Sequence, residues 1–284
     1  MSFVLYALVK TYTLLTKYLL RRKFNFRGHQ HANDTFRIFF FSLHHKETSL
    51  RTMKILMRGI KKVLKFTGTP LEPMQLAYFE LRLLIIRIRN RIDPSFIIRR
   101  RSLLSLDDVC LHFGCGGRNL PGWLNIDGDP RPGVEHIQDL RQPLPLRDNT
   151  CQYIFTEHVI EHIDMESLER TLQELHRVLK SDGVLRIIVP DCSKYADAYL
   201  RKDLNFLQNV APGCKTIAEG LNIVFVGVLH KFIYDFETLK IRLIEVGFQK
   251  VEESTHMGSK YPELRIDSEN PSRNPTNLYV EAKK

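Results

Sequence analysis

The sequence predicts an α/β fold in residues 107–284, with a seven-stranded, mostly parallel sheet and helices on both of its faces. Three observations lead to this prediction. Short apolar runs alternate with helical patterns from Val109 onward, the first run enters a glycine-rich turn, and the last two runs are typical of an antiparallel pair. Such sheets bind ligands at the carboxyl ends of their strands.

Charge separates the N-terminal region from the rest of the chain. Residues 1–105 contain 21 Lys+Arg and 5 Asp+Glu, a net charge of +16, whereas the remainder contains 21 and 27, a net charge of −6. A basic region of this kind is typical of contact with an anionic surface, or of a solvated helix face. We expect no nucleic-acid partner, because the acidic domain has no basic bias. Five scattered cysteines without CxxC spacing favour a reducing, cytoplasmic location.

The N-terminal region itself divides into two segments. Residues 1–52 are an extension that we expect to be dispensable for folding. Its apolar run Phe3–Leu20 is interrupted by two lysines, which favours a helix lying on the inner face of a membrane over a membrane span. Residues 53–106 are predicted to form a basic helical arm, in which a helix over Met74–Ile92 ends before Pro94.

The glycine-rich turn follows the buried run VCLHF. Gly114 and Gly116 allow the backbone to approach a ligand closely and to adopt positive φ angles. The dinucleotide pattern GxGxxG would require glycine at Asn119, so a nicotinamide cofactor is disfavoured. Asp127 ends the next strand and is a candidate to bind ribose hydroxyls. An equally consistent interpretation is that Asp127 caps its own Asp-Gly turn.

Five further strands complete the predicted sheet. The third ends at Asp139, the fourth is CQYIFTE, and the fifth is a wholly apolar run that follows an amphipathic helix. The inward positions of this helix are Leu172, Leu175, Val178 and Leu179. KVEEST and NLYVEAKK form the closing antiparallel pair. The polar loop between them either folds over the acceptor site or is an ordinary surface excursion.

Four segments together resemble a known family: LHFGCGGRNLPGWLNIDGD, LPLRDNTCQYIFTEHVIEHI, ELHRVLKSDGVLRIIVPD and HKFIYDFETLKIRLIEVGF. They are similar to class I S-adenosylmethionine (SAM)-dependent methyltransferases, which have a Rossmann-like fold. The resemblance is closest to the short-loop bacterial group with GCG, PGW and NID motifs, which is often found among genes of polysaccharide biosynthesis. It covers Asp107 to the C-terminus.

The resemblance implies SAM as the cofactor and O-methylation of a small or glycan acceptor as the reaction. It implies that the turn Gly114, Cys115 and Gly116 wraps the methionine part of SAM. By the same resemblance, Asp127 at the end of the second strand holds the ribose, and Asp139 and Leu140 border the adenine. Many class I enzymes carry an acid at the position of His112 to bind the methionine amino group. Another group would have to substitute here.

His158, Glu161 and His162 spell H-x-x-E-H, which is also the pattern of an inverted zinc-peptidase motif. We favour a structural role, because the preceding residues form a strand rather than a long helix, and we expect no metal. His158 is a candidate to line the SAM or acceptor pocket.

The candidate catalytic residues are Asp191, His230 and Tyr234, polar groups near predicted element ends that could orient or deprotonate a hydroxyl acceptor. The alternative for His230 is that it caps the following helix. Two other functions stay open: a sugar-nucleotide glycosyltransferase that uses the D-x-D sequence of Asp127 and Asp129, and a catalytically inactive SAM-fold scaffold at a membrane surface.

Overall fold

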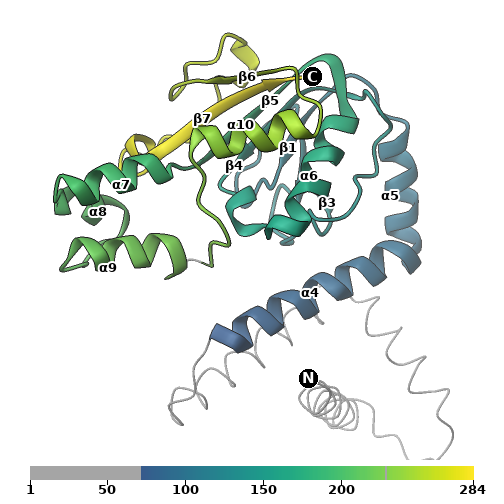
Figure 1. The fold of residues 1–284 in the computed structure, drawn as a ribbon. Helices are drawn as coiled ribbons and strands as arrows, with labels where there is room; N and C mark the ends of the chain where they lie inside the picture. Colours follow the sequence, from purple (N-terminus) through teal and green to yellow (C-terminus); the bar gives the residue numbers. More distant parts are fainter. Residues whose placement is uncertain (1–71, 228) are drawn as a thin grey trace, which may run out of the picture. The chain divides into compact units, whose positions relative to one another are not determined.

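The computed structural model describes residues 72–227 and 229–284, and residues 76–284 form one compact unit (Figure 1). The predictions for residues 1–52 and for the start of the basic arm lie outside the described residues. In the described part, no helix is long and apolar enough to cross a membrane.

Seven strands form a single sheet in the order β3-β2-β1-β4-β5-β7-β6. They are β1 Val109–Phe113, β2 Leu124–Asp127, β3 His136–Ile137, β4 Cys151–Glu157, β5 Leu179–Pro190, β6 Lys250–Glu253 and β7 Asn277–Lys283. All neighbouring pairs are parallel except β5–β7 and β6–β7. The predicted seven-stranded, mostly parallel sheet is confirmed.

Helices and helical turns precede, connect and follow the strands. The α-helices are α4 Glu72–Ile92, α5 Pro94–Leu104, α6 Met165–Val178, α7 Cys192–Leu200, α8 Leu204–Val210, α9 Ile217–Asn222 and α10 Phe236–Glu245. The shorter turns are η1 Ile160–His162, η2 Ile223–Gly227, η3 Pro262–Leu264 and η4 Asn274–Thr276. Residues 114–123, between β1 and β2, form turns, as the short spacing between these strands predicted.

α4 ends just before Pro94 as expected, and Pro94 is also the first residue of α5. The ring of a proline suits the first position of a helix, where no backbone N–H is needed. Asp93 caps the new helix by accepting a hydrogen bond from the Ser95 N–H at 2.9 Å. The predicted basic arm therefore contains two helices in its described part, separated by a defined corner.

The main core lies on the face of the sheet that is covered by α6 and α10 (Figure 1). Leu172, Leu175 and Val178 are buried on α6 as predicted, whereas Leu179 already belongs to β5. The second core cluster joins Phe155 and Ile188 to Leu264 of η3. Among the described residues, the helical element in this second cluster is the short 3-10 turn η3, in the loop before β7.

The prediction of a wholly apolar fifth strand is wrong because of Arg186, whose side chain is completely buried in β5. Its guanidinium forms a bidentate pair with Asp267, at 2.7 and 2.6 Å, and a second pair with Glu281 at 2.9 Å. Charge-assisted hydrogen bonds of this geometry are needed to keep a charge inside a protein. Arg186 therefore fixes the loop before β7 to the sheet.

Candidate functional site

The glycine turn follows β1 and is held against β2. The backbone N–H groups of Gly114 and Cys115 both donate to the carbonyl oxygen of Ile126, at 2.9 and 3.1 Å. At Gly114 a Cβ atom would lie 2.3 Å from Val159 Cγ2, so only glycine allows this close packing. Gly116 has a φ of +56°, and no described atom would lie within 4 Å of a Cβ there. The turn is therefore packed at its first glycine and open at Gly116.

Asp127 connects this turn to the end of β2. Its Oδ2 accepts from the Gly116 N–H at 2.7 Å, and its Oδ1 accepts from the Asp129 N–H at 2.6 Å. The second bond is the turn cap that the sequence offered as the alternative interpretation. Asp127 thus caps its own turn and also lies beside the glycine turn, where a ribose site was predicted.

Asp129 has a different environment, although it lies two residues away. Its Oδ1 is 3.0 Å from Arg82 Nη1 of α4, and its Oδ2 is 3.1 Å from Arg131 Nε. Both carboxylate oxygens are therefore paired with guanidinium groups. A D-x-D metal clamp would need the carboxylate of Asp129 to be available to a cation, so this pairing weakens the glycosyltransferase alternative.

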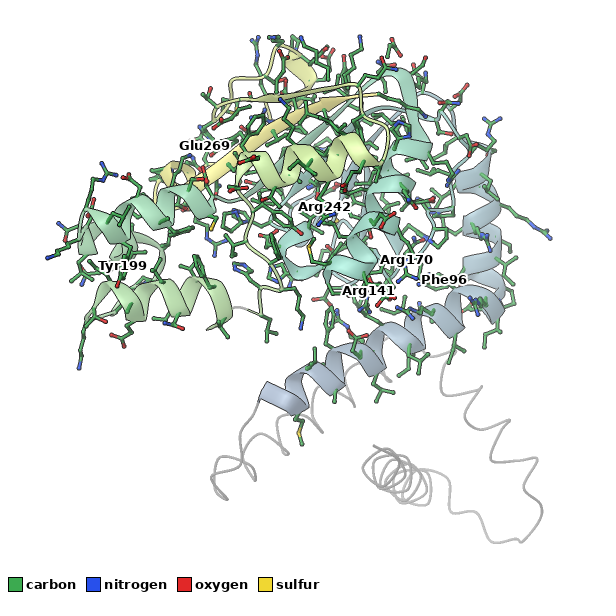
Figure 2. The ribbon with its side chains drawn as sticks, viewed as in Figure 1. Phe96, Arg141, Arg170, Tyr199, Arg242 and Glu269 are labelled. Carbon is green, nitrogen blue, oxygen red and sulfur yellow. The ribbon has the colours of Figure 1, made fainter. Side chains whose placement is uncertain are left out.

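Asp139 lies beyond the short strand β3, which ends at Ile137 rather than at Asp139 as predicted. Its carboxylate is buried and accepts from Arg87 Nε at 2.7 Å and from Arg141 Nε at 3.1 Å. Burial alone would raise the pKa of Asp139, but the bonds from Arg141 and Arg87 outweigh burial and lower the pKa. Arg141 also holds Glu80 of α4 and lies beside that helix in Figure 2. The carboxylate of Asp139 thus anchors α4 to the sheet.

His112 points into the sheet rather than toward a ligand. Its Nδ1 lies 3.1 Å from Asn125 Oδ1 of β2, and its ring packs against Phe155. Burial lowers the pKa of His112 to about 4, against a smaller opposing effect of the hydrogen bond to Asn125. The imidazole is neutral at pH 7 and does not replace the acid that class I enzymes carry at this position.

The end of β4 brings the H-x-x-E-H residues together. His158 has a φ of +54° and donates its backbone N–H to Ile188 of β5 at 2.9 Å. A non-glycine residue in this conformation costs of order 1 kcal/mol or more, and such residues are concentrated at functional sites. The His158 Nδ1 lies 3.1 Å from Oε1 of the fully buried Glu161.

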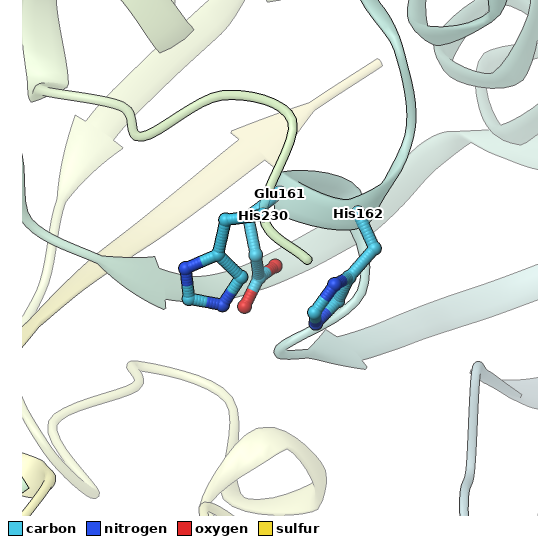
Figure 3. Close-up of side chains that lie close together, drawn as sticks. All are labelled: Glu161, His162 and His230. Atoms are coloured by element: carbon cyan, nitrogen blue, oxygen red, sulfur yellow. The ribbon is translucent and has the colours of Figure 1, made fainter. Parts of the chain in front are cut away.

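His230 joins this group from a distant part of the chain (Figure 3). Its ring centroid is 4.8 Å from that of His162, and one potential ligand atom from each of Glu161, His162 and His230 lies within 4.8 Å of the others. The helix that follows His230 is capped by Asp235 instead, through a bond to the Thr238 N–H at 2.8 Å. The prediction that His230 caps this helix is therefore wrong.

The other two predicted catalytic residues have structural positions. Tyr234 is completely buried, and its hydroxyl faces the sulfur of Met165 at 3.9 Å. Burial raises the pKa of Tyr234 far above its ordinary value. Asp191 is 5% exposed and caps α7 by accepting from the Ser193 N–H at 3.0 Å. Tyr234 is thus part of the core, and Asp191 caps a helix.

A polar cluster that was not predicted from the sequence lies at the carboxyl end of β4. Glu157 pairs with Arg118, which follows the glycine turn, at 3.2 Å. Glu157 also accepts hydrogen bonds from the hydroxyl and N–H of Ser268, and Arg118 donates to the carbonyl oxygen of Ile266. Ser268 and Ile266 belong to the long loop before β7. That loop therefore packs against the carboxyl end of β4 and the residues after the glycine turn.

Comparison with known proteins adds one match within the sequence and several to solved structures. Residues 123–187 match the family model described as a methyltransferase domain. No curated protein matches the chain significantly.

Three solved structures illustrate the similarity. One is a SAM-dependent methyltransferase from Archaeoglobus fulgidus, at 17% identity and a TM-score of 0.40, with 69% of this chain and 98% of that chain covered. A second is an S-adenosylmethionine-dependent methyltransferase from Mesorhizobium loti, at 16% identity and a TM-score of 0.37, with 67% and 97% covered. The third is the CMeT domain of the citrinin polyketide synthase, at 13% identity and a TM-score of 0.37; the match covers 62% of this chain and 46% of that structure.

The matched residues run from the turn before β2 into β5, and they include the ends of β2 and β4 described above. They lie within a seven-stranded sheet in which β7 runs in the opposite direction to the other six strands. SAM is the cofactor that such a domain implies. The match to residues 123–187 and this sheet make the domain similar to the class I SAM-dependent methyltransferases that the sequence motifs resemble.

Proposed function

We propose that the protein transfers a methyl group from SAM to an oxygen atom of a small or glycan acceptor. The observation that supports this most directly is the hydrogen bond between the Gly116 N–H and Asp127 Oδ2, 2.7 Å long, across the ends of β1 and β2. It places a backbone turn with one open face beside a fixed carboxylate. A nucleoside ligand needs both features, one for close approach and one for its ribose hydroxyls.

The residues at these strand ends fit SAM with one reassignment. Gly114, Cys115 and Gly116 would hold the methionine part, and Asp127 would hold the ribose. Because the carboxylate of Asp139 is already occupied by two arginines, the adenine contact would fall to Leu140 and the backbone beside it. When bound, SAM supplies an electrophilic methyl group on a sulfonium.

His230 is the predicted catalytic residue that the structure supports best. Its Nδ1 lies 2.6 Å from the carbonyl oxygen of Val224, which can only accept, so Nδ1 carries the proton. Burial lowers the pKa of His230, which favours the neutral ring with a free lone pair on Nε2. A neutral imidazole of this kind can accept the proton of an acceptor hydroxyl or bind a cation.

The purified protein is expected to bind SAM and its demethylated product with micromolar-scale affinity, measured by titration calorimetry. Asp127→Ala should weaken binding by about tenfold or more, because it removes the ribose ligand and loosens the glycine turn. Asp129→Asn is the matched control, since Asp129 faces Arg82 and Arg131, and it should change affinity by less than about threefold. Binding of a sugar nucleotide but not of SAM would instead support the glycosyltransferase alternative.

The acceptor class is tested by transfer from methyl-labelled SAM. We expect label in glycans or small hydroxyl compounds and none in nucleic acid, because the −6 charge of residues 106–284 disfavours a polyanion. Tight SAM binding with no transfer to any acceptor would favour the inactive scaffold. Label in nucleic acid or protein alone would contradict O-methylation of a glycan or small molecule.

A further inference from the structure

Glu161, His162 and His230 form a mixed carboxylate and imidazole cluster, of which the proposed reaction uses only His230, as a candidate base. Their potential ligand atoms lie within 4.8 Å of one another (Figure 3). Bonds of about 2.0–2.2 Å from a tetrahedral zinc ion place its ligand atoms about 3.4 Å apart, so the cluster would have to contract by little more than 1 Å. Side-chain rotation alone can supply such a change.

The buried carboxylate of Glu161 gives an independent reason to expect a ligand here. The side chain of Glu161 is completely buried, and its Oε2 has no hydrogen-bond partner among the described residues. Its Oε1 is held by His158 Nδ1 at 3.1 Å. An unsatisfied oxygen in a buried carboxylate is costly, and buried charges are normally paired or bound to a metal. A cation between the carboxylate and the two imidazoles would remove this cost.

Both imidazoles are oriented as metal-binding histidines usually are. His230 Nδ1 donates to the Val224 carbonyl at 2.6 Å, and His162 Nδ1 lies 3.4 Å from the Leu229 carbonyl. A carbonyl partner on one ring nitrogen fixes the tautomer and leaves the lone pair on the other nitrogen for the metal. Within the described part of the chain, Nε2 of each histidine has no hydrogen-bond partner and is left to bind an ion.

The backbone holds the two halves of the cluster together. The carbonyl oxygen of Glu161 accepts from the N–H groups of Lys231 and Phe232, at 2.7 and 3.2 Å. The loop that carries His230 is thereby tied to η1 at the position of Glu161. Such preorganisation reduces the free-energy cost of bringing ligands from distant segments to one ion.

We propose that Glu161, His162 and His230 bind a divalent cation of the zinc type. Two imidazoles and one carboxylate are a donor set that suits zinc and similar transition metals better than Mg²⁺ or Ca²⁺. Three protein ligands leave a fourth coordination position of the ion open, as they do in catalytic zinc sites. The acceptor oxygen could bind at this fourth position. That last role depends on the proposed methyl transfer, whereas binding of the cation does not.

This site differs from the one that the H-x-x-E-H pattern indicates. In the pattern both His158 and His162 would bind the ion, but here His158 holds Glu161 and is not among the three ligands. His230, which lies outside the pattern, takes its place. The two arrangements predict different effects of substitution at residues 158 and 230.

The full-length protein is expected to bind about one equivalent of Zn²⁺ or Co²⁺ after dialysis, measured by elemental analysis, and tetrahedral Co²⁺ should give an intense visible absorption band. Glu161→Gln and His230→Ala should each weaken binding by more than about 100-fold, since even outer partners of a metal ligand contribute about 10- to 100-fold. His158→Asn should retain the bound metal within about tenfold. Asparagine tolerates the positive φ of residue 158 and can still donate to Glu161.

Calorimetry with SAM on the same variants separates a lost metal site from a lost fold. The expected result is that Glu161→Gln and His230→Ala lose metal and retain SAM binding. His256→Gln, which changes a histidine outside the cluster, should retain both ligands. Less than a tenth of an equivalent of metal on the wild-type protein would overturn the proposal, as would full metal retention by a Glu161→Gln/His230→Ala double variant.

Discussion

Replacing Asp267 with alanine is expected to lower the free energy of unfolding by about 3–5 kcal/mol, because it leaves the buried charge of Arg186 without its bidentate partner. The guanidinium would retain Glu281 and the Thr255 carbonyl, at 2.9 and 2.8 Å. Those contacts do not compensate for two charge-assisted hydrogen bonds in a site closed to water. Urea denaturation of the variant and the wild type measures the difference.

A surface ion pair is the matched control. Asp197 of α7 pairs with Arg201, the residue that follows this helix, and both side chains are more than half exposed. Asp197→Asn should therefore cost less than about 1 kcal/mol. Arg186→Met in the Asp267→Ala background should restore part of the lost stability, since it removes the unpaired charge. A cost below about 1 kcal/mol for Asp267→Ala would show that water or Glu281 stabilises Arg186 sufficiently.

Stability is expected to fall steeply as the pH decreases from about 6.5 to about 4, because His112 and His136 are buried as neutral rings. Burial lowers the pKa of each to about 4, whereas the unfolded chain has histidine pKa values of about 6.5. Their contribution to stability is fully present above pH 6.5. Between the two values the unfolded state binds protons that the folded state excludes, so each histidine removes up to about 1.4 kcal/mol per pH unit.

Urea denaturation at pH 7, 6 and 5 tests this dependence. A His112→Gln/His136→Gln double variant should be less stable at pH 7, because it loses the ring contacts with Phe155 and Phe96, but its stability should change less between pH 7 and pH 5. An unchanged pH dependence in the double variant would mean that other groups cause the acid sensitivity.

The parts of the fold that the sequence predicted correctly depend on neighbouring residues. The apolar runs of β1 and β4, the turn between β1 and β2, and the buried stripe of α6 are all patterns within short windows. The short β3 was overestimated because VEHIQDL has the composition of a strand, but pairing with β2 is possible for only two residues. Element ends depend on such pairing and are not visible in a short window.

The features that the sequence did not predict join residues that are far apart in the chain. The fifth strand was predicted to be wholly apolar, yet Arg186 is buried in it. The carboxylates that pair with Arg186, those of Asp267 and Glu281, lie 81 and 95 residues later in the chain. His230 comes to Glu161 and His162 from another loop, so the H-x-x-E-H pattern alone could not indicate this neighbour. Tyr234 and Asp191 were selected because polar residues near element ends are often functional. Tyr234 lies in the core and Asp191 caps α7. Tyrosine is also common in cores, and aspartate is also common at helix N-caps, so the residue types alone do not indicate catalysis.

The position of β7 between β5 and β6 constrains how the chain can fold during its synthesis. β5 is synthesised long before β7, so the edge of β5 that pairs with β7 stays unpaired until β7 has left the ribosome. An unpaired strand edge promotes aggregation. Arg186 lies on β5, and both of its acidic partners, Asp267 and Glu281, are translated after it. A nascent chain that ends before Asp267 therefore has an open sheet edge and lacks both acidic partners of Arg186. Completion of the sheet is consequently a late event in the folding of this domain.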